Sequence, residues 1–391
     1  MALRKNIKTA KSAILGLSLL VAQAALAQAP EKAQPASDVN FTDFQSGVVR
    51  IEKNNKVGFL DKEGKEVAPI KYESAYDMTE DMAAIRKDGK WGFMNKAGKE
   101  VIAFEYDDVQ NFSNSLAAVK LGDKWGFIDK KGKVKVPFDY DKALSFRENL
   151  AFVKQEGKWG VINEKNHFVA KPQFDKVESY SEGLAMVAVA GKYGFIDTKG
   201  KEVIPMVYKG AKSFVEGRAA VKNDAKKWGF IDANNNMVIA ANYEEVDNYS
   251  EGLAVVRNHD KWKVIDKTGA DLVASTYDFI QGASEGMIIV YTNKKFGVID
   301  KTGKEIVPAK YDNLWGYSDG YARAINNGKY GFIDKSGQEV IPLIYDDAYN
   351  FSEGLARISL FGKSGFINKN GREVFPDNQM PKSILSSINN D

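Results

Sequence analysis

The chain has 391 residues, of which 44% are hydrophobic and 12% aromatic, so a continuous apolar core is possible and global disorder is excluded. It contains no cysteine, which excludes disulfides and thiol chemistry. The 55 lysine and arginine side chains nearly balance the 52 acidic ones.

The first 27 residues have the features of a secretory signal peptide. An apolar run at 14–22 is followed by Ala25-Leu26-Ala27, which offers a small-x-small site, so cleavage is expected after Ala27. Four basic residues precede the apolar run: Arg4, Lys5, Lys8 and Lys11. The run is too short to predict a membrane span, and no stable span is expected after cleavage. We therefore expect the mature protein in the periplasm or outside the cell.

Cleavage would change the charge of the chain. The segment 1–27 carries four basic and no acidic side chains, so the remainder has 51 basic and 52 acidic ones and a net charge of about −1. A nearly neutral chain with interspersed charges lacks the basic footprint of nucleic-acid binding, so no nucleic-acid partner is expected.

The remainder divides into a linker, a repeat array and a tail. Residues 28–40 are polar and rich in Ala and Pro, which predicts a short linker. The repeat array occupies residues 41–376. Beyond it the chain is polar and loses its period, so residues 377–391 are expected to form a flexible tail.

The array consists of ten copies of one unit with a period of 34 residues. The unit is marked by a glycine, which Lys263 replaces in one copy. The other markers are Gly58, Gly92, Gly126, Gly160, Gly194, Gly229, Gly297, Gly331 and Gly365. Every step is 34 residues except the 35 between Gly194 and Gly229. A fixed period of this length indicates tandem structural repeats that share one core.

Each unit predicts three short antiparallel strands. The first two are the apolar run at 116–120 and the alternating segment Lys124–Asp129, joined by a Gly-Asp turn. A hairpin is predicted at 129–132, because Asp opens the turn and Gly takes the left-handed conformation. The third strand ends at Pro137, which cannot donate to a ladder and marks a strand end or an edge.

The connection to the next unit has a different spacing. Apolar residues recur three apart, as in Tyr140, Ala143 and Phe146, which predicts one turn of helix or 3₁₀-helix laid against the strands. A Ser-Glu-Gly exit, as at 352–354, leads to the next strand. The predicted fold is thus all-β: ten three-stranded units forming an open superhelix (solenoid) or a β-propeller-like ring. A four-stranded propeller blade usually takes about 40–45 residues, so the shorter unit slightly favours the open form.

The repeated residues resemble the WG-repeat (KWG-repeat) family of bacterial proteins. The shared core is Lys-Trp-Gly-Phe-Ile-Asp-Lys-x-Gly-Lys-Glu-Val-Ile-Pro followed by Tyr-Asp, and it is almost complete at 329–346. The resemblance covers about 41–376, with local departures such as Lys263 for glycine and Val57 or Ser364 for the aromatic residue. It implies a β-rich repeat of variable copy number and little about activity.

Two further positions hardly vary among the copies. The residue two before the marker glycine is Lys in all ten copies. The Tyr or Phe that follows the third predicted strand, such as Tyr140, is followed by an acidic residue in eight of nine copies, Lys209 being the exception. A row of lysines could bind an anionic polymer, but the acids would cancel its field. We therefore expect each lysine to pair with a carboxylate of its own or the next unit. The aromatic residue before each glycine is expected in the core, with the glycine admitting a neighbouring backbone or ring.

Aromatic residues at positions that the repeat does not require are better binding candidates. Trp315 and Tyr349 occupy a slot that is polar in most copies, and Tyr321 replaces the usual Leu. Tyr317 fills a regular aromatic slot close to them in sequence. We predict a binding patch of Trp315, Tyr317, Tyr321 and Tyr349, suited to stacking on a sugar or gripping a peptide. A plain surface or core role for these residues stays open.

Catalytic, cofactor and metal motifs are weak or absent in the sequence. His167 and His259 lie in different copies at different phases, so no paired-histidine metal site follows. No phosphate-binding loop, nucleophile elbow or dinucleotide fingerprint occurs. The expected function is an exported, non-catalytic scaffold without cofactors that binds a protein or a cell-envelope glycan through an extended surface. A glycosidase-like hydrolase with carboxylates paired across repeats is the alternative.

Overall fold

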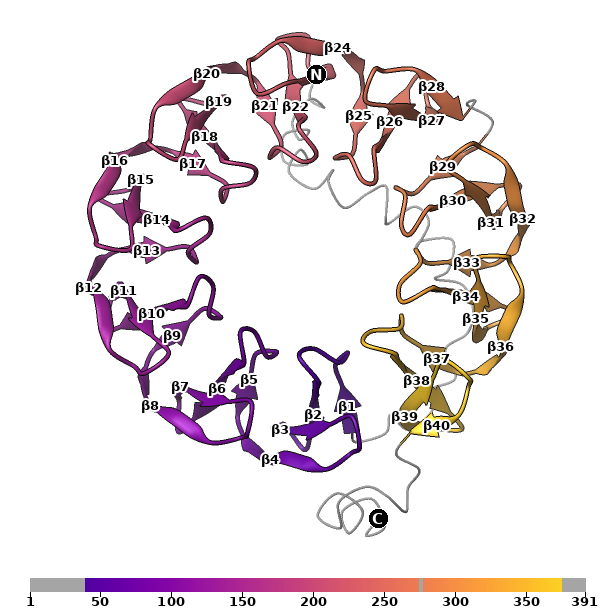
Figure 1. Cartoon of the computed structure of the whole chain (residues 1–391), viewed down its shortest axis with the longest axis horizontal. Helices are drawn as coiled ribbons and strands as arrows, with labels where there is room; N and C mark the ends of the chain where they lie inside the picture. Colours follow the sequence, from indigo (N-terminus) through magenta and orange to yellow (C-terminus); the bar gives the residue numbers. More distant parts are fainter. Residues whose placement is uncertain (1–38, 274–276, 375–391) are drawn as a thin grey trace, which may run out of the picture. The chain divides into compact units, whose positions relative to one another are not determined.

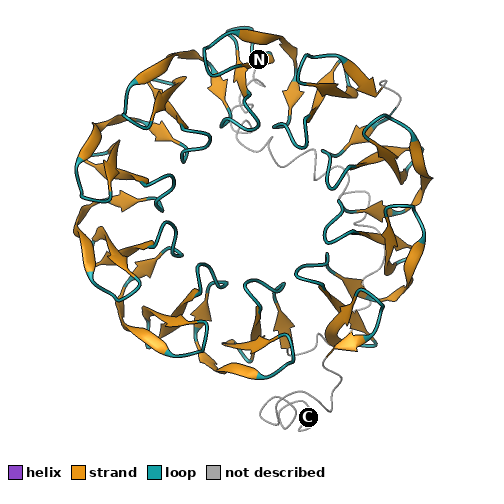
Figure 2. Ribbon diagram, in the orientation of Figure 1, coloured by secondary structure: helices purple, strands orange, loops and turns teal. Residues whose placement is uncertain are grey.

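The described part of the chain is a ring of β-sheets. The computed structural model describes residues 39–273 and 277–374, within the compact unit Ser37–Asp391. These residues form ten four-stranded antiparallel sheets and no helix, so this part holds no candidate for a membrane-spanning helix. The sheets surround a central opening as the blades of a propeller (Figures 1 and 2), and we number the blades 1 to 10 in chain order. The predicted signal peptide, nearly all of the linker and the tail lie outside the described residues.

The four strands of a blade follow one another from the centre to the rim, and each pairs with its neighbour in sequence. The first strands are short and lie innermost: β1 (Val39–Phe41), β5 (Ser74–Ala75), β9 (Asp108–Val109), β13 (Lys142–Ala143), β17 (Lys176–Val177), β21 (Gly210–Ala211), β25 (Glu245–Val246), β29 (Phe279–Ile280), β33 (Asn313–Leu314) and β37 (Asp347–Ala348). The second strands are β2 (Val48–Lys53), β6 (Met82–Lys87), β10 (Leu116–Leu121), β14 (Leu150–Gln155), β18 (Leu184–Val189), β22 (Ala219–Lys222), β26 (Leu253–Asn258), β30 (Met287–Thr292), β34 (Tyr321–Asn326) and β38 (Leu355–Leu360).

The third and fourth strands complete each blade. The third strands carry the marker glycine: β3 (Lys56–Asp61), β7 (Lys90–Asn95), β11 (Lys124–Asp129), β15 (Lys158–Asn163), β19 (Lys192–Asp197), β23 (Trp228–Ile231), β27 (Lys261–Asp266), β31 (Lys295–Asp300), β35 (Lys329–Asp334) and β39 (Lys363–Asn368). The fourth strands form the outer edge: β4 (Glu66–Tyr72), β8 (Glu100–Tyr106), β12 (Val134–Tyr140), β16 (Phe168–Phe174), β20 (Glu202–Tyr208), β24 (Met237–Tyr243), β28 (Asp271–Val273), β32 (Glu305–Tyr311), β36 (Glu339–Tyr345) and β40 (Glu373–Val374).

The hairpin between the third and fourth strands forms as the sequence predicts. In blade 3, Oδ1 of Asp129 accepts the backbone N–H groups of Lys131 and Lys133, each at 3.0 Å. Gly132 has a φ of 78°, the left-handed conformation that a β-carbon disfavours. Pro137 lies inside β12 rather than at its end, and β12 is the edge strand, where a residue without an N–H leaves no central ladder bond unmade.

The predicted helical connection is wrong, and with it the count of three strands. Tyr140 ends β12, Ala143 lies in the short strand β13 and Phe146 follows it in an inward-pointing hairpin. All three side chains are buried in one core cluster between blades 3 and 4. A tight crossing from rim to centre can therefore bring residues three apart into one core without a helical turn. The unit fits four strands into 34 residues because the first strand is only two residues long in nine blades.

The array closes into a ring, so the prediction of a propeller-like ring is confirmed and the slight preference for an open superhelix is wrong. The Phe366 ring of blade 10 meets the Phe44 ring of blade 1 edge to face at 5.0 Å. Phe127 of blade 3 and Phe146 of blade 4 meet in the same way at 4.7 Å. The last interface thus uses the same contact as the interfaces within the array.

Candidate functional site

The Ser-Glu-Gly exit joins each blade to the next. Glu182 and Gly183 both have positive φ, which gives a two-residue hairpin turn between Ser181 and Leu184. The hydroxyl of Ser181 donates to the carbonyl of Phe214 in the following blade at 2.7 Å. Equivalent bonds to the next blade are Thr79 to Phe112, Ser113 to Phe146, Ser250 to Ala283, Ser318 to Phe351 and Ser352 to Phe44.

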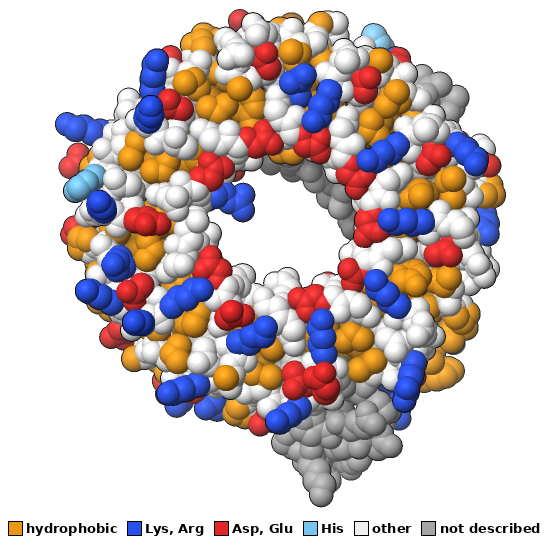
Figure 3. Space-filling model, viewed as in Figure 1, with side chains coloured by type: hydrophobic (Ala, Val, Ile, Leu, Met, Phe, Trp, Pro, Cys, Tyr) orange, Lys and Arg blue, Asp and Glu red, His pale blue; other side chains and the backbone are white. Residues whose placement is uncertain are grey.

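The acid of this turn makes a second joint, which we call the acid joint. The carboxylate of Glu148 accepts the backbone N–H of Gly183 in the next blade at 3.0 Å. The same bond links Glu80 to Ser115, Glu182 to Gly217, Glu216 to Gly252, Glu251 to Gly286, Glu285 to Gly320, Asp319 to Gly354 and Glu353 to Gly47. Acidic side chains accordingly border the central opening in Figure 3, with basic side chains beside them. The acids are bound into the ring and need no external ligand.

The ring should lose stability in acid through these joints. Burial raises the pKa of Glu353, but the Lys62 ammonium and the N–H of Gly47 outweigh it, and the pKa is lowered. A lowered folded pKa stabilises the ring above the unfolded value of about 4.3, and this contribution is lost as pH falls through the folded pKa. We expect the urea midpoint to fall between pH 6 and pH 3, by less in Glu353→Gln. Equal pH dependence in both proteins would contradict this role.

The recurring lysine pairs with the recurring acid, which confirms the structural expectation for this row. Lys124 Nζ lies 2.6 Å from Asp141 in the connection to the next blade. The same pair occurs as Lys90–Asp107, Lys158–Asp175, Lys227–Glu244, Lys295–Asp312 and Lys329–Asp346. Where Lys209 replaces the acid, Asp224 takes its place and contacts both Lys192 and Lys209.

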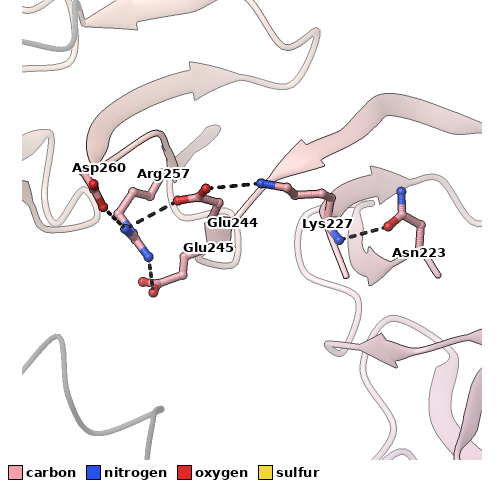
Figure 4. Close-up of polar contacts among 6 residues, drawn as sticks. All are labelled: Asn223, Lys227, Glu244, Glu245, Arg257 and Asp260. Carbon is pink, nitrogen blue, oxygen red and sulfur yellow. Dashed lines mark hydrogen bonds and ion pairs between the residues drawn. The ribbon is translucent and has the colours of Figure 1, made fainter. Parts of the chain in front are cut away.

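One of these pairs belongs to the larger network in Figure 4. Lys227 contacts Glu244 at 3.2 Å, and Glu244 also faces Arg257 at 3.6 Å. Arg257 further contacts Glu245 at 2.6 Å and Asp260 at 2.9 Å. Each cation in this cluster already has carboxylate partners, so the cluster offers no unmatched field for an anionic polymer.

The aromatic residue before the glycine is packed between blades to differing degrees. Trp91, Trp125 and Phe296 are buried, which confirms the core prediction for them. At the equivalent position Trp159, Tyr193, Trp228, Trp262 and Tyr330 are half-buried.

The four predicted patch residues lie in three places. Tyr317 is a core residue with 5% exposure, and its hydroxyl donates to the carbonyl of Asp334. Trp315 and Tyr349 belong to the hairpins of blades 9 and 10 that point into the central opening (Figure 1). Tyr321 begins β34 and lies beside a separate hollow. The structure thus brings Trp315 and Tyr349 together, and binding by any of the four stays a prediction.

Arginines that the sequence analysis missed link Trp315 to Tyr349. The Arg323 guanidinium lies 3.7 Å from the centre of the Trp315 ring and 5.6 Å from that of Tyr349. The Arg357 guanidinium, on the same blade as Tyr349, lies 3.3 Å from the centre of the Tyr349 ring. The Tyr330 ring stacks on the Trp315 ring, with 6.0 Å between the ring centres. We call Tyr330, Trp315, Arg323, Tyr349 and Arg357 the arginine–aromatic stack.

The arginines also bridge blades through the backbone. Arg323 donates to the carbonyl of Ala348 and Arg357 to that of Phe41, each in the following blade. Arg50 of blade 1 donates to the carbonyl of Ala75, and its Nε lies 3.2 Å from Asp77. The three interfaces involved are 9–10, 10–1 and 1–2, centred on the point of ring closure.

A comparison of the copies could have found these arginines. They occupy one repeat position of the second strand, its third residue (the second in the shorter β22), where the other seven blades carry apolar side chains: Ala84, Ala118, Phe152, Met186, Ala220, Val255 and Ile289. A charge in a slot that is otherwise apolar is as unusual as a Trp in a polar slot. Three such charges on consecutive blades, with Asp43 and Asp77 opposite them, set this sector apart from the rest of the ring.

Metal ligation finds no support within residues 39–273 and 277–374, since no group of three or more His, Cys, Asp or Glu side chains there could hold an ion. His167 and His259 lie in blades 4 and 7.

Several solved structures match the chain at low sequence identity. An eukaryotic initiation factor matches with 12% identity over 76% of this chain and 96% of that chain, with a TM-score of 0.49. BamB from Moraxella catarrhalis matches with 13% identity over 84% and 99%, with a TM-score of 0.34. The extracellular domain of a putative hybrid two component system from B. thetaiotaomicron matches with 10% identity over 86% and 57%, with a TM-score of 0.25.

The family is shown by the repeats themselves. No match was found among curated proteins. The model of the WG containing repeat matches residues 58–91, 91–125, 125–159, 159–193, 193–226, 228–262, 296–330 and 330–363. These segments cover well over half of the chain, and the chain belongs to the WG-repeat family.

Proposed function

We propose that this propeller is an exported, non-catalytic scaffold that binds a protein or a cell-envelope glycan at the central opening, over blades 9, 10 and 1. The observation that carries the proposal is the arginine–aromatic stack. Ring-like repeats need no such group to close, because seven of the ten blades have apolar residues in the arginine slot. The N-terminal signal-like segment supports export.

The stack offers edges and polar tips rather than ring faces. The Tyr349 ring has two guanidinium groups near it, those of Arg323 and Arg357. The Trp315 ring has the Arg323 guanidinium and the Tyr330 ring as neighbours. Tyr349 is still 36% exposed, and Tyr76 on blade 2 is 37% exposed. Tyrosine and arginine held rigidly in this way lose little entropy on binding, which suits the anchor positions of an interface. A protein segment or a glycan chain lying along the opening would meet these tips together.

The test uses residues that other blades already carry. Trp315→Gln and Arg323→Ala introduce the side chains found at the same slots in blades 3 and 2. We expect capture of a partner from envelope extract by the wild-type protein to be lost in the double variant, while the melting temperature changes little. Gln281→Ala, at the Trp315 slot of blade 8, is the matched control and should capture normally. Capture that is unchanged in the double variant would overturn the proposal.

A second candidate, a glycosidase-like hydrolase, is favoured by one pair of carboxylates in the same sector. Burial raises the pKa of Asp43, although Arg357 and Arg323 lower it, and the nearby Asp77 carboxylate raises it further. Two carboxylates on neighbouring blades are the pair of groups that glycoside hydrolysis uses. Hydrolysis of a cell-wall or dietary glycan that Asp43→Asn abolishes would favour this candidate over the scaffold.

A further inference from the structure

We propose that the C-terminal tail, residues 377–391, folds back onto blade 10 and covers an exposed apolar corner of the ring. The corner consists of Phe361, in the turn between β38 and β39, and Ile344 near the end of β36. Phe361 is 82% exposed and Ile344 47%. Phe361 lies at the opposite end of β38 from the hairpin that carries Tyr349. This surface is therefore separate from the arginine–aromatic stack and goes beyond the proposed function.

Phe361 departs from the repeat at a position where a bulky side chain is unfavourable. Its φ is 51°, a left-handed conformation that bulky residues rarely adopt. Its N–H donates to Oδ2 of Asp346 at 2.7 Å, so the backbone of the turn is fixed while the ring stays in solvent. A strained, exposed phenylalanine points to a function at this position. Eight other blades carry Gly, Ala or a polar residue there: Asn54, Asp88, Gly122, Glu156, Ala190, His259, Asn293 and Asn327.

Ile344 is a second departure at the same corner. It lies two residues before Asp346, the residue that accepts the N–H of Phe361. It fills the sixth position of the outer strand, which is apolar in one other full-length strand, as Val207 of β20. In the other six the position is polar or charged: Lys71, Glu105, Asp139, Gln173, Asn242 and Lys310. Two large apolar side chains therefore meet solvent where blade 9 passes into blade 10.

The outer strand of blade 10 directs the chain toward this corner. β40 pairs antiparallel with β39 through Val374 and Phe366, so the chain beyond β40 runs toward Lys363 at the start of β39. Lys363 pairs with Leu360 across the turn that holds Phe361. Phe366 and Lys363 are three residues apart, about 10 Å along a strand. The tail can extend about 50 Å, so it is long enough to reach the corner and fold over it.

The tail carries apolar side chains suited to this corner. Its large apolar residues are Met380, Ile384, Leu385 and Ile388. Three of them recur four residues apart, a spacing that places side chains on one face of a helical turn. The linker before the ring is different, because residues 28–38 contain no apolar side chain larger than proline. Of the two segments that flank the ring after the expected cleavage, the tail is therefore the one that can bury the corner.

The test is hydrogen exchange of the full chain, followed by mass spectrometry of the peptide that spans the tail. We expect the tail amides to exchange at least about tenfold more slowly than those of a synthetic peptide of the same sequence. The double variant Phe361→Asn/Ile344→Lys gives the corner residues that other blades carry, and its tail should exchange at the free-peptide rate. Val207→Lys, the same position as Ile344 in blade 5, is the matched control and should leave the tail protected.

A wild-type tail that exchanges at the free-peptide rate would overturn the proposal, and so would tail protection that survives the double variant. Protection of residues 28–38 that the double variant removes would assign the corner to the linker instead. A dimer in sedimentation that the double variant dissociates would assign it to a second copy of the chain. Because Asn suits a left-handed turn, the double variant should melt at or above the wild-type temperature. Loss of tail protection would then not reflect unfolding of the ring.

Discussion

Replacing Gly126 with alanine is expected to lower the free energy of unfolding by about 2–3 kcal/mol, because the added β-carbon has nowhere to go. It would lie 2.6 Å from the carbonyl oxygen of Val136 and 3.0 Å from backbone atoms of Pro137. The outer strand comes this close because β12 has a β-bulge opposite the glycine. Trp125 pairs with Tyr140 but Phe127 pairs with Val136, so β12 has extra residues between these two pairs. Backbone atoms in a paired strand cannot turn aside as a side chain can. Urea denaturation followed by tryptophan fluorescence would measure the loss.

Gly282→Ala is the control for this substitution. A β-carbon on Gly282 would meet no atom within 4 Å, and its backbone needs no left-handed conformation, so the unfolding midpoint should stay the same or rise. Equal loss in both variants would contradict the steric explanation. Blade 7 carries the natural version of the experiment, with Lys263 at the glycine position. There Nζ of Lys263 lies 2.6 Å from the carboxylate of Asp271 in β28, so the side chain is directed to the outer strand and ends in an ion pair.

The close approach at the glycine shows what a repeat can reveal without a structure. Ten copies of one segment make a required glycine visible, and the prediction that it admits a neighbouring backbone is confirmed at Gly92, Gly126, Gly194 and Gly229. The Lys–acid pairs were predictable for the same reason, since two positions that hardly vary and carry opposite charges are expected to form an ion pair. Local rules repeated ten times leave little ambiguity.

The strand count and the ring closure could not be obtained in this way. A strand of two residues, such as β13, has no period of its own, and the spacing of Tyr140, Ala143 and Phe146 imitates a helical turn. Whether the array closes depends on the small rotation between neighbouring blades, to which every interface contributes and which no single residue specifies. The closing contacts of Phe44 use the ordinary repeat residues, so they carry no separate signal in the sequence.

The sequence predicted the aromatic residues of the candidate site but not its arginines. Trp315 and Tyr349 stood out as aromatics in a polar slot, but Arg323 and Arg357 were overlooked because charged residues are common in the chain as a whole. Their slot is apolar in the other blades, and only a comparison of copies position by position exposes them. Tyr317 illustrates the opposite error, since proximity in sequence grouped a core residue with its exposed neighbours.

Replacing Phe366 with alanine is expected to open the ring. The side chain is 1% exposed and packs against Phe41 at 5.2 Å and Phe44 at 5.0 Å across the interface between blades 10 and 1. Loss of a buried phenylalanine costs about 3–5 kcal/mol. Other neighbouring blades are joined by the chain that runs from a fourth strand to the next first strand, whereas within the described residues blade 10 and blade 1 are held together by non-covalent contacts only. Small-angle scattering should show a larger maximum dimension.

Phe127→Ala separates loss of stability from loss of closure. Phe127 is fully buried and meets Phe146 in the same edge-to-face contact, so its removal should lower the unfolding midpoint by a similar amount. Blades 3 and 4 are joined directly by the chain between β12 and β13, which keeps them adjacent when their packing is weakened. We therefore expect Phe127→Ala to scatter as a closed ring while Phe366→Ala does not. If both variants scatter alike, closure does not depend on this contact, and the joints formed by Ser352, Glu353 and Arg357 hold the ring without it.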